Sequence, residues 1–371
     1  MRLPRARGPL TAALFARLAA PPVDQDRFRG APAAGHDRFP AVPHRPAGAD
    51  LADGDLQLAL FACYELHYQG FDDVDPRWEW EPSLLAFRAA LERRFEQALA
   101  GAVPRPVAVP PGKVRAALAE LTAPGSGPSL SAHLRRHAGL AQFREFVAHR
   151  SVYHLKEADP HTWAIPRLRG GPKAALVEIQ ADEYGGGRTE RMHAELFRAT
   201  MRGLGLDDSY GAYLGRVPGV TLAVSNAMSL FGLHRRLRGA AAGHLAALEM
   251  TSSLPNRHYA DGLRRLGGDA TAARFYDEHV QADAVHEQIA AHDLCAGLAA
   301  QDPALSGDIL FGAACALELD RLWAEHVMAC WRRGASSLDP PVPHEQSTTS
   351  TRSTETTEST DSAGSAVAST A

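Results

Sequence analysis

The apolar positions between residues 55 and 334 recur at intervals of three or four, with proline and glycine separating the runs. This spacing is typical of amphipathic helices, in which one face packs against a core. The runs DLQLALFACYELHYQGF and SAHLRRHAGLAQFREFVAHRSVYHLKE both follow it. No segment shows the alternation of a strand, so the pattern predicts an all-α protein.

Changes in composition divide the chain into four parts. Residues 1–50 are rich in Pro, Ala, Gly and Arg, and residues 336–371 are rich in Ser and Thr without an aromatic residue. Neither composition can build a core, so we expect both ends to be mostly disordered. Between them we expect a smaller N-terminal helical region over 51–130 and a helical bundle over 131–335. Because proline interrupts helices, we expect Pro255 to break the helix that precedes it.

Charge and cysteine content narrow the function classes. The formal net charge is −4, which does not favour a nucleic-acid partner. No run reaches the roughly 20 apolar residues that a membrane span needs, and Arg17 interrupts the only short apolar stretch near the start. We therefore expect a cytoplasmic protein. The cysteines encode neither a disulfide framework nor a zinc ribbon; they are Cys63, Cys295, Cys315 and Cys330.

The strongest local signal for chemistry is the segment HVQADAVH, which contains His279, Asp283 and His286. On a helix these residues point within roughly 60° of one another. Two imidazoles and a carboxylate on one face form half of a metal site of the type that iron favours. The alternative is a polar stripe that faces solvent, which the same spacing also produces.

Two further segments offer carboxylates. Glu249 stands alone among alanines and leucines, where a glutamate is rarely buried unless it is paired or binds a metal. Glu183 and Glu190 precede His193, with the glycines 185–187 between the two glutamates. Each glycine costs a helix roughly 1 kcal/mol relative to alanine, so the segment is either a re-aimed helix or a loop between two short helices.

A third segment, HLKEADPHTWAIPRL, places Glu157 and His161 around the end of a helix. Helix capping and a role at a metal site are both consistent with these residues. His244 lies five residues before Glu249, about 140° away around the helix. We expect His244 to lie on the surface or to support a ligand without binding the metal itself.

A ferritin-like diiron site would need a Glu-x-x-His motif on each of two helices. Glu190 and His193 provide one such motif. The second would have to be Asp283 with His286, which leaves His279 without a role. The sequence therefore fits a ferritin-like site poorly.

At these residues the sequence resembles the haem-oxygenase-like diiron oxidases and oxygenases, also called iron-containing redox enzymes. Their pattern is a Glu and a His on one helix, a lone Glu on the next, and a His-x-x-x-Asp-x-x-His helix. The resemblance covers about residues 137–334, and its matching positions are Glu183, His193, Glu249, His279, Asp283 and His286. It is nearest to the N-oxygenases of the streptozotocin type, in which a segment like that around Glu157 supplies an extra ligand. Those proteins also carry a cupin, and no cupin pattern follows residue 335 here.

The resemblance implies a haem-oxygenase-like helical bundle that binds two Fe(II) ions and uses O₂ as cosubstrate. It implies that Glu183, rather than Glu190, is the partner of His193. Related reactions include N-hydroxylation and oxidative C–C cleavage or decarboxylation of amino or fatty acids. We expect N-oxygenation of a small amino-acid-like metabolite in a biosynthetic pathway, with C–C cleavage as the alternative and no catalytic residue beyond the metal ligands.

Two other classes remain open. A haem-binding oxygenase on the same fold would need one proximal His and would not use three carboxylates. A non-enzymatic helical interaction module would need no metal. The expected partner is a small-molecule substrate, and the apolar positions of residues 51–100, with Trp78 and Trp80, favour packing on the bundle or a homodimer.

Overall fold

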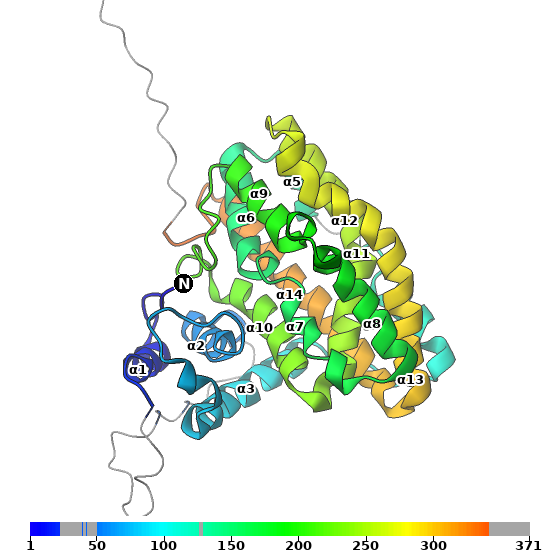
Figure 1. Ribbon diagram of the computed structural model, residues 1–371. Helices are drawn as coiled ribbons and strands as arrows, with labels where there is room; N and C mark the ends of the chain where they lie inside the picture. Colours follow the sequence, from blue (N-terminus) through cyan, green and yellow to red (C-terminus); the bar gives the residue numbers. More distant parts are fainter. Residues whose placement is uncertain (23–38, 40–41, 43–49, 126–128, 341–371) are drawn as a thin grey trace, which may run out of the picture.

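The computed structural model describes residues 1–22, 39, 42, 50–125 and 129–340 (Figure 1). Over these residues the regular structure is helical, and none of them belongs to a strand. The predicted all-α class is confirmed. None of the described helices is both long enough and apolar enough to cross a membrane.

The helices fall into an N-terminal set and a bundle. The N-terminal set is α1 (Pro9–Leu18), α2 (Gly54–Glu65), α3 (Pro82–Ala102) and α4 (Val114–Leu121). The bundle is α5 (Leu130–Arg136), α6 (Leu140–His154), α7 (Asp159–Thr162), α8 (Gly170–Glu183), α9 (His193–Gly203), α10 (Gly219–Leu233), α11 (Arg238–Arg265), α12 (Ala270–Gln288), α13 (Gly297–Gln301) and α14 (Ser306–Arg332). A π-helical segment, η9 (Ile289–Ala296), joins α12 to α13.

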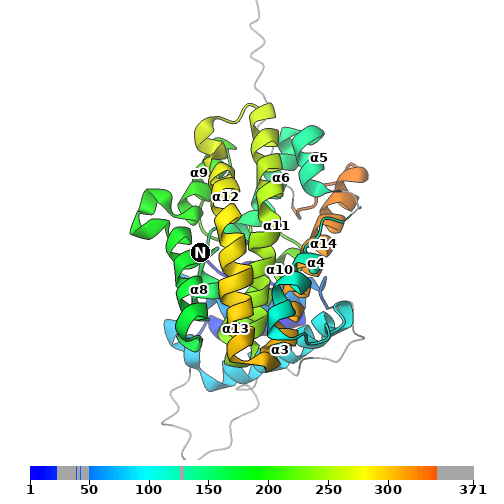
Figure 2. The same cartoon turned by 90° about the vertical axis from the view of Figure 1, so that its right-hand side faces the viewer.

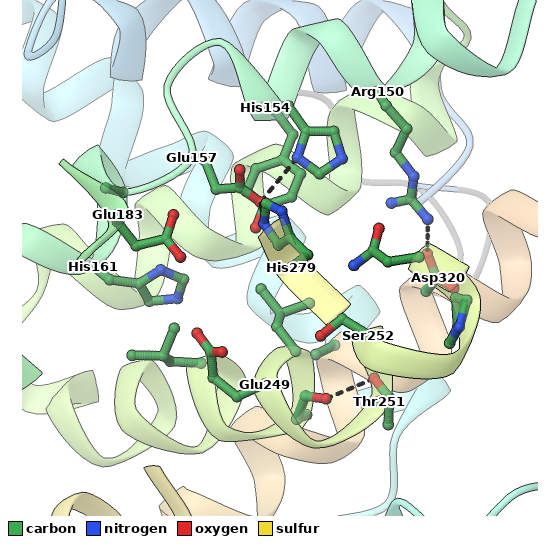
Figure 3. A pocket seen from close by; sticks show the side chains of 18 of the residues that line it. Arg150, His154, Glu157, His161, Glu183, Glu249, Thr251, Ser252, His279 and Asp320 are labelled. Atoms are coloured by element: carbon green, nitrogen blue, oxygen red, sulfur yellow. Dashed lines mark hydrogen bonds and ion pairs between the residues drawn. The ribbon is translucent and has the colours of Figure 1, made fainter. Parts of the chain in front are cut away.

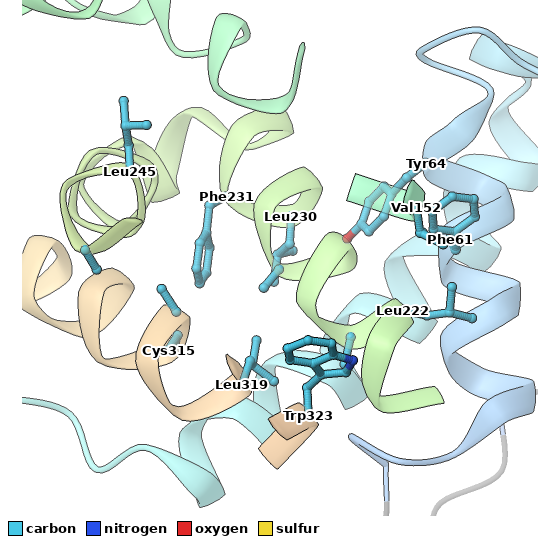
Figure 4. Close-up of a cluster of buried hydrophobic side chains, with 14 of the residues drawn as sticks. Phe61, Tyr64, Val152, Leu222, Leu230, Phe231, Leu245, Cys315, Leu319 and Trp323 are labelled. Atoms are coloured by element: carbon cyan, nitrogen blue, oxygen red, sulfur yellow. The ribbon is translucent and has the colours of Figure 1, made fainter. Parts of the chain in front are cut away.

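The bundle is organised around α11, which packs against α12 on one side and against α14 on the other (Figure 2). Gly312 of α14 lies so close to α11 that an added Cβ would overlap the backbone carbonyl of Ala240. Gly243 of α11 approaches the carbonyl of Ile309 in the same way. The two glycines therefore allow the two longest helices to cross at close range. Beside this crossing lies an apolar cluster that includes Phe231 and Trp323 (Figure 4).

The helix that contains Pro255 does not end there, so the expected break is wrong. Helix α11 runs without interruption from Arg238 to Arg265. A proline inside a helix removes one backbone hydrogen bond and costs about 3 kcal/mol. Contacts with α5, α12 and α14 on both sides of Pro255 hold the helix together and outweigh that cost.

The glycines 185–187 end one helix and allow the next to start in a new direction. All three have positive φ angles, of 66°, 60° and 79°, which residues with a side chain rarely adopt. Helix α8 accordingly stops at Glu183, and α9 begins at His193. Of the two readings of this segment, the structure shows the loop between helices.

Part of the N-terminal segment that was expected to be disordered is helical, so that expectation is wrong for α1. Its buried side chains Leu10, Leu14 and Leu18 form one apolar face that packs on α2. Asp55 accepts hydrogen bonds from the backbone N–H groups of Leu10 and Thr11 and so fixes the start of the helix. Most of residues 23–49 lie outside the described part of the chain.

The start of the C-terminal segment that was expected to be disordered, 336–371, is also ordered. Ser337 and Leu338 are buried against the bundle, and the backbone N–H of Ser337 donates to Glu145. The chain is described as far as Pro340, and residues 341–371, which carry most of the Ser/Thr-rich tail, lie outside the described residues.

The N-terminal helix α2 is buried between α1 and α10 (Figure 1). At its end Glu65 pairs with Lys156 of the bundle at 2.7 Å, and both side chains are almost completely buried. The hydroxyl of Tyr210 also donates to Glu65, at 2.8 Å. The apolar surface of α2 is therefore covered within the same chain.

Candidate metal centre

Polar side chains from several bundle elements meet in the interior beside α11. Glu183 is the last residue of α8, His193 is the first of α9, and Glu249 lies in the middle of α11. Glu157 comes from the turn after α6, and His279 and His286 come from α12. All six are buried, although they span residues 157–286 of the sequence.

These side chains form two groups, each with ligand atoms within 4.8 Å of one another. The first group is Glu157, Glu183, His193 and His279. The second is Glu183, Glu249 and His286. Glu183 belongs to both groups, so one carboxylate stands between two sets of donors.

The distances within the groups are those of side chains that face one another. His193 Nδ1 lies 2.9 Å from Glu183 Oε2, and His279 Nε2 lies 3.6 Å from Glu157 Oε1. In the second group His286 Nδ1 lies 3.4 Å from Glu249 Oε2. Asp283 also belongs to α12, between the two histidines, but its side chain is not among those that the structure describes.

Several of these atoms are buried without a hydrogen-bond partner among the described residues. They are Glu157 Oε2, Glu183 Oε2, His193 Nδ1 and His286 Nδ1. His193 Nδ1 and Glu183 Oε2 are close, but their orientation is not that of a hydrogen bond. Buried polar atoms without partners are costly, and a cation between them would satisfy carboxylate and imidazole lone pairs at once. The donor set thus fits one or two metal ions.

Two histidines are oriented by hydrogen bonds on the opposite side of the ring. His279 Nδ1 donates to the carbonyl of Phe275 at 2.8 Å, so Nε2 is the ring nitrogen that faces Glu157. His286 Nε2 lies 3.1 Å from Asp182 Oδ2, which leaves Nδ1 toward Glu249. Such bonds fix the tautomer of metal-binding histidines. Sequence reasoning did not assign Asp182 this role, although it lies next to Glu183.

His154 is a second residue that sequence reasoning missed. It is the last residue of α6, three positions before Glu157, and its Nδ1 lies 2.9 Å from Glu157 Oε1. Burial alone would raise the pKa of the Glu157 carboxyl, but His154 and His279 outweigh burial and hold that pKa well below its ordinary value. The i, i+3 spacing of His154 and Glu157 was the signal that could have indicated the pair.

The pKa of His286 moves in the opposite direction. Burial lowers it, but the nearby carboxylates of Glu249, Asp182 and Glu183 raise the pKa to about 9. Without a metal His286 is therefore protonated at neutral pH. A metal bound at Nδ1 would displace that proton.

His161 and His244 form a buried pair next to these groups. His161 Nε2 lies 3.4 Å from His244 Nδ1, and burial lowers the pKa of His161 to about 4. His244 is only 2% exposed, which excludes the surface position and leaves the supporting role as the remaining alternative of the prediction. Glu190, by contrast, is exposed and belongs to neither group, which argues against a ferritin-like pairing with His193.

A cavity of about 260 Å³ opens beside the carboxylates (Figure 3). Its inner wall includes Glu157, Glu183, Glu249 and His161. Its wall also includes side chains of α6, α11 and α14. A small molecule in this cavity would lie against the two donor groups.

The fold and this centre define an all-α protein with a buried carboxylate and histidine cluster of the kind that binds non-haem iron. Residues 144–321, which carry all of the side chains of both groups, match the family model of iron-containing redox enzymes. The match assigns residues 144–321 of the helical bundle to this family and supports an iron-dependent oxidoreductase. None of the curated proteins matches the chain.

Proposed function

We propose that the bundle binds two Fe(II) ions and uses O₂ to oxidise a small amino-acid-like metabolite. The observation that carries the proposal is Glu183, which belongs to two donor groups at once. In this assignment one ion would be held by Glu157, His193 and His279 and the other by Glu249 and His286, and Glu183 would be shared by both. Asp283, which α12 carries between the two histidines, is the further ligand that the family resemblance implies.

The chain's own residues prepare the site for iron. Three described carboxylates, Glu157, Glu183 and Glu249, offset most of the charge of two Fe(II) ions. Imidazole and carboxylate donors suit ferrous iron and leave coordination positions open. Ferrous ions bound there would supply electrons to O₂, so the protein needs no nucleophile. Burial of the cluster excludes bulk water from the reaction.

Glu157 favours N-oxygenation of an amine or guanidine over C–C cleavage. Its carboxylate lies in the first donor group rather than at a solvated helix end. An additional anionic ligand favours the higher oxidation state of the iron it binds. Helix capping as the role of Glu157 is not supported, because its Oε1 faces His154 and His279.

Iron stoichiometry of Glu183→Gln tests the proposal. After anaerobic loading with Fe(II), the wild type should hold two irons without a Soret band, and Glu183→Gln should lose both, since a neutral amide at the shared position would weaken both groups. Glu190→Gln, an exposed position seven residues away, is the matched control and should keep two irons. A Soret band would indicate haem. Two irons in Glu183→Gln would contradict the bridging assignment.

A further inference from the structure

The cavity beside the metal centre has a charged end that the donor groups do not use. Arg150 Nη2 lies 2.6 Å from Asp320 Oδ1, and both residues line the cavity. The Arg150 side chain is 17% exposed and that of Asp320 51%, so the pair lies where the cavity meets solvent. Figure 3 shows this pair on the opposite side of the view from Glu183 and His161.

Arg150 is held in place by aromatic rings rather than by several carboxylates. Its guanidinium carbon lies 3.9 Å from the ring centroid of Trp323 and 5.9 Å from that of Phe146. The ion pair with Asp320 joins only Nη2 and Oδ1. The second oxygen of Asp320 and the other N–H groups of Arg150 take no part in this pair.

The same end of the cavity offers further polar groups. Asn256 lines the cavity there and is only 7% exposed. Pro255 has no N–H, so the carbonyl of Thr251 lacks the donor that residue i+4 normally supplies in a helix. A helix carbonyl without its usual donor, beside a buried side-chain amide, favours a ligand that supplies hydrogen bonds.

The charged end and the metal centre are separated by a defined length. Glu249 and Asn256 lie seven residues apart on α11, a rise of about 10 Å along the helix axis. Leu245, Leu248 and Leu317 also line the cavity. A ligand that reaches both ends therefore needs a polar head and a long, largely apolar stem.

We propose that the Arg150–Asp320 end binds the zwitterionic head of an α-amino acid with a long side chain and directs the end of that side chain to the metal centre. The substrate carboxylate pairs with Arg150, and its ammonium pairs with Asp320 and the oxygens of Asn256 and Thr251. The oxidation that the proposed function assigns to the centre then falls on the distal group. A fatty acid has no ammonium group and would leave Asp320 without a partner on the ligand. A simple amine has no carboxylate and would leave Arg150 without one.

Calorimetry on the full chain, both iron-free and loaded with Fe(II) without oxygen, tests the head site. The probes are L-lysine, L-arginine and L-norleucine, with cadaverine and agmatine lacking the carboxylate and 6-aminohexanoate lacking the α-ammonium. At least one amino acid should bind, and its truncated analogue should bind about 10- to 100-fold more weakly, as expected for one lost charge-assisted bond.

Two variants should remove that discrimination. Arg150→Met should weaken amino-acid binding about 10- to 100-fold without affecting the analogue that lacks the carboxylate. Asp320→Asn, at a half-exposed position that tolerates substitution, should weaken amino-acid binding to the same extent. It should not affect binding of the analogue that lacks the α-ammonium. Arg321→Met is the matched control, because Arg321 forms an exposed ion pair with Glu318 outside this cavity. Equal binding of intact and truncated probes, or no binding of any probe, would overturn the proposal.

Orientation is tested separately, with Mn(II) in place of iron. Proton NMR should show stronger paramagnetic broadening at the terminal methylene of a bound amino acid than at its α-proton, and the reverse would overturn the orientation. The outcomes separate the two proposals. A wild type that takes up no Fe(II) on anaerobic loading but still discriminates between the probes would contradict the proposed function alone. A wild type that holds two irons but does not discriminate between the probes would contradict the head site alone.

Discussion

At the scale of single residues, the candidate centre depends on side chains that hold other side chains in place. Asp182 determines which ring nitrogen of His286 faces the carboxylates, and the Phe275 carbonyl does the same for His279. His154 holds Glu157 in the same way. An imidazole that rotates freely would lose conformational entropy on binding iron, and these hydrogen bonds remove that cost in advance.

Asp182→Asn tests this orienting role. The amide can no longer accept a charge-assisted bond from His286 Nε2, so iron affinity should fall about 10- to 100-fold while helical content stays at the wild-type level. Equilibrium dialysis with Fe(II) and circular dichroism measure the two quantities. Glu178→Gln, an exposed change one turn earlier on α8, is the control. Unchanged affinity in Asp182→Asn would show that Asp182 does not orient the ring.

At the scale of elements, the centre exists because helix ends and helix crossings are fixed. The positive-φ glycines 185–187 separate Glu183 at the end of α8 from His193 at the start of α9 and allow the two side chains to meet. The α11–α14 crossing at Gly243 and Gly312 sets the position of Glu249 relative to the cavity wall. The glycines 185–187 are required by their positive φ angles, and Gly243 and Gly312 by the close approach of another backbone, so a residue with a side chain is disfavoured at all five positions.

Gly312→Ala should destabilise the bundle by about 1–3 kcal/mol, because its methyl group would overlap the carbonyl of Ala240 and force the helices apart. Denaturant unfolding followed by circular dichroism measures the loss. Gly171→Ala is a suitable control, since an added Cβ there meets nothing within 4 Å and its φ is not positive. Equal stability of the two variants would mean that the crossing can relax without cost.

A buried histidine that joins three elements should make the fold sensitive to acid. His149 of α6 bonds Thr221 of α10 and Ser337 of the C-terminal segment, at 2.8 and 3.0 Å. Burial, with His326 and Arg150, lowers its pKa from 6.5 to about 3. The neutral form is therefore favoured in the folded state, and its contribution to stability is present above pH 6.5 and is lost as pH falls toward 3.

The stability lost between pH 6.5 and pH 5 should be about 2 kcal/mol for this group. His149→Gln keeps hydrogen-bonding atoms but does not titrate, so its unfolding free energy should fall less steeply over that range. Urea unfolding at several pH values gives the slopes. His137→Gln removes an exposed histidine and should retain the wild-type slope. An unchanged slope in His149→Gln would contradict the assignment.

At the scale of the whole molecule, the N-terminal helices are part of the scaffold that holds the centre. Lys156, which pairs with Glu65 of α2, is the residue immediately before Glu157. The buried pair thus joins the N-terminal set to the turn that carries a proposed ligand. The homodimer stays a prediction, and α2 does not require one, because α1 and α10 already cover it.

Lys156→Met should lower the unfolding free energy by about 3–5 kcal/mol, since it leaves the Glu65 carboxylate buried without a countercharge. The double variant Lys156→Met/Glu65→Leu should recover most of that loss, because no buried charge remains. The exposed pair Arg236–Glu96 provides the comparison: Arg236→Met should cost less than about 1 kcal/mol. A double variant as unstable as the single one would show that the packing, not the charge, is what matters.

The sequence by itself determined the helical class and the identity of the groups that could bind iron. Helical spacing of apolar residues reports which face is buried, and i, i+4, i+7 spacing reports which polar residues share a face, because both depend only on the local geometry of the helix. His279 and His286 could therefore be proposed as ligands from the spacing on α12 alone. Pairing Glu183 with His193 needed the resemblance to a family, since the intervening glycines left two conformations open.

Only the tertiary structure decided how these local pieces meet. The continuation of α11 through Pro255, the order of α1 and the burial of His244 all depend on contacts between elements distant in sequence, which outweigh local propensity. The sharing of Glu183 by two donor groups and the placement of Arg150 opposite them are likewise properties of the packed bundle. Local spacing carries no information on such distances, because they are fixed by how helices pack in three dimensions.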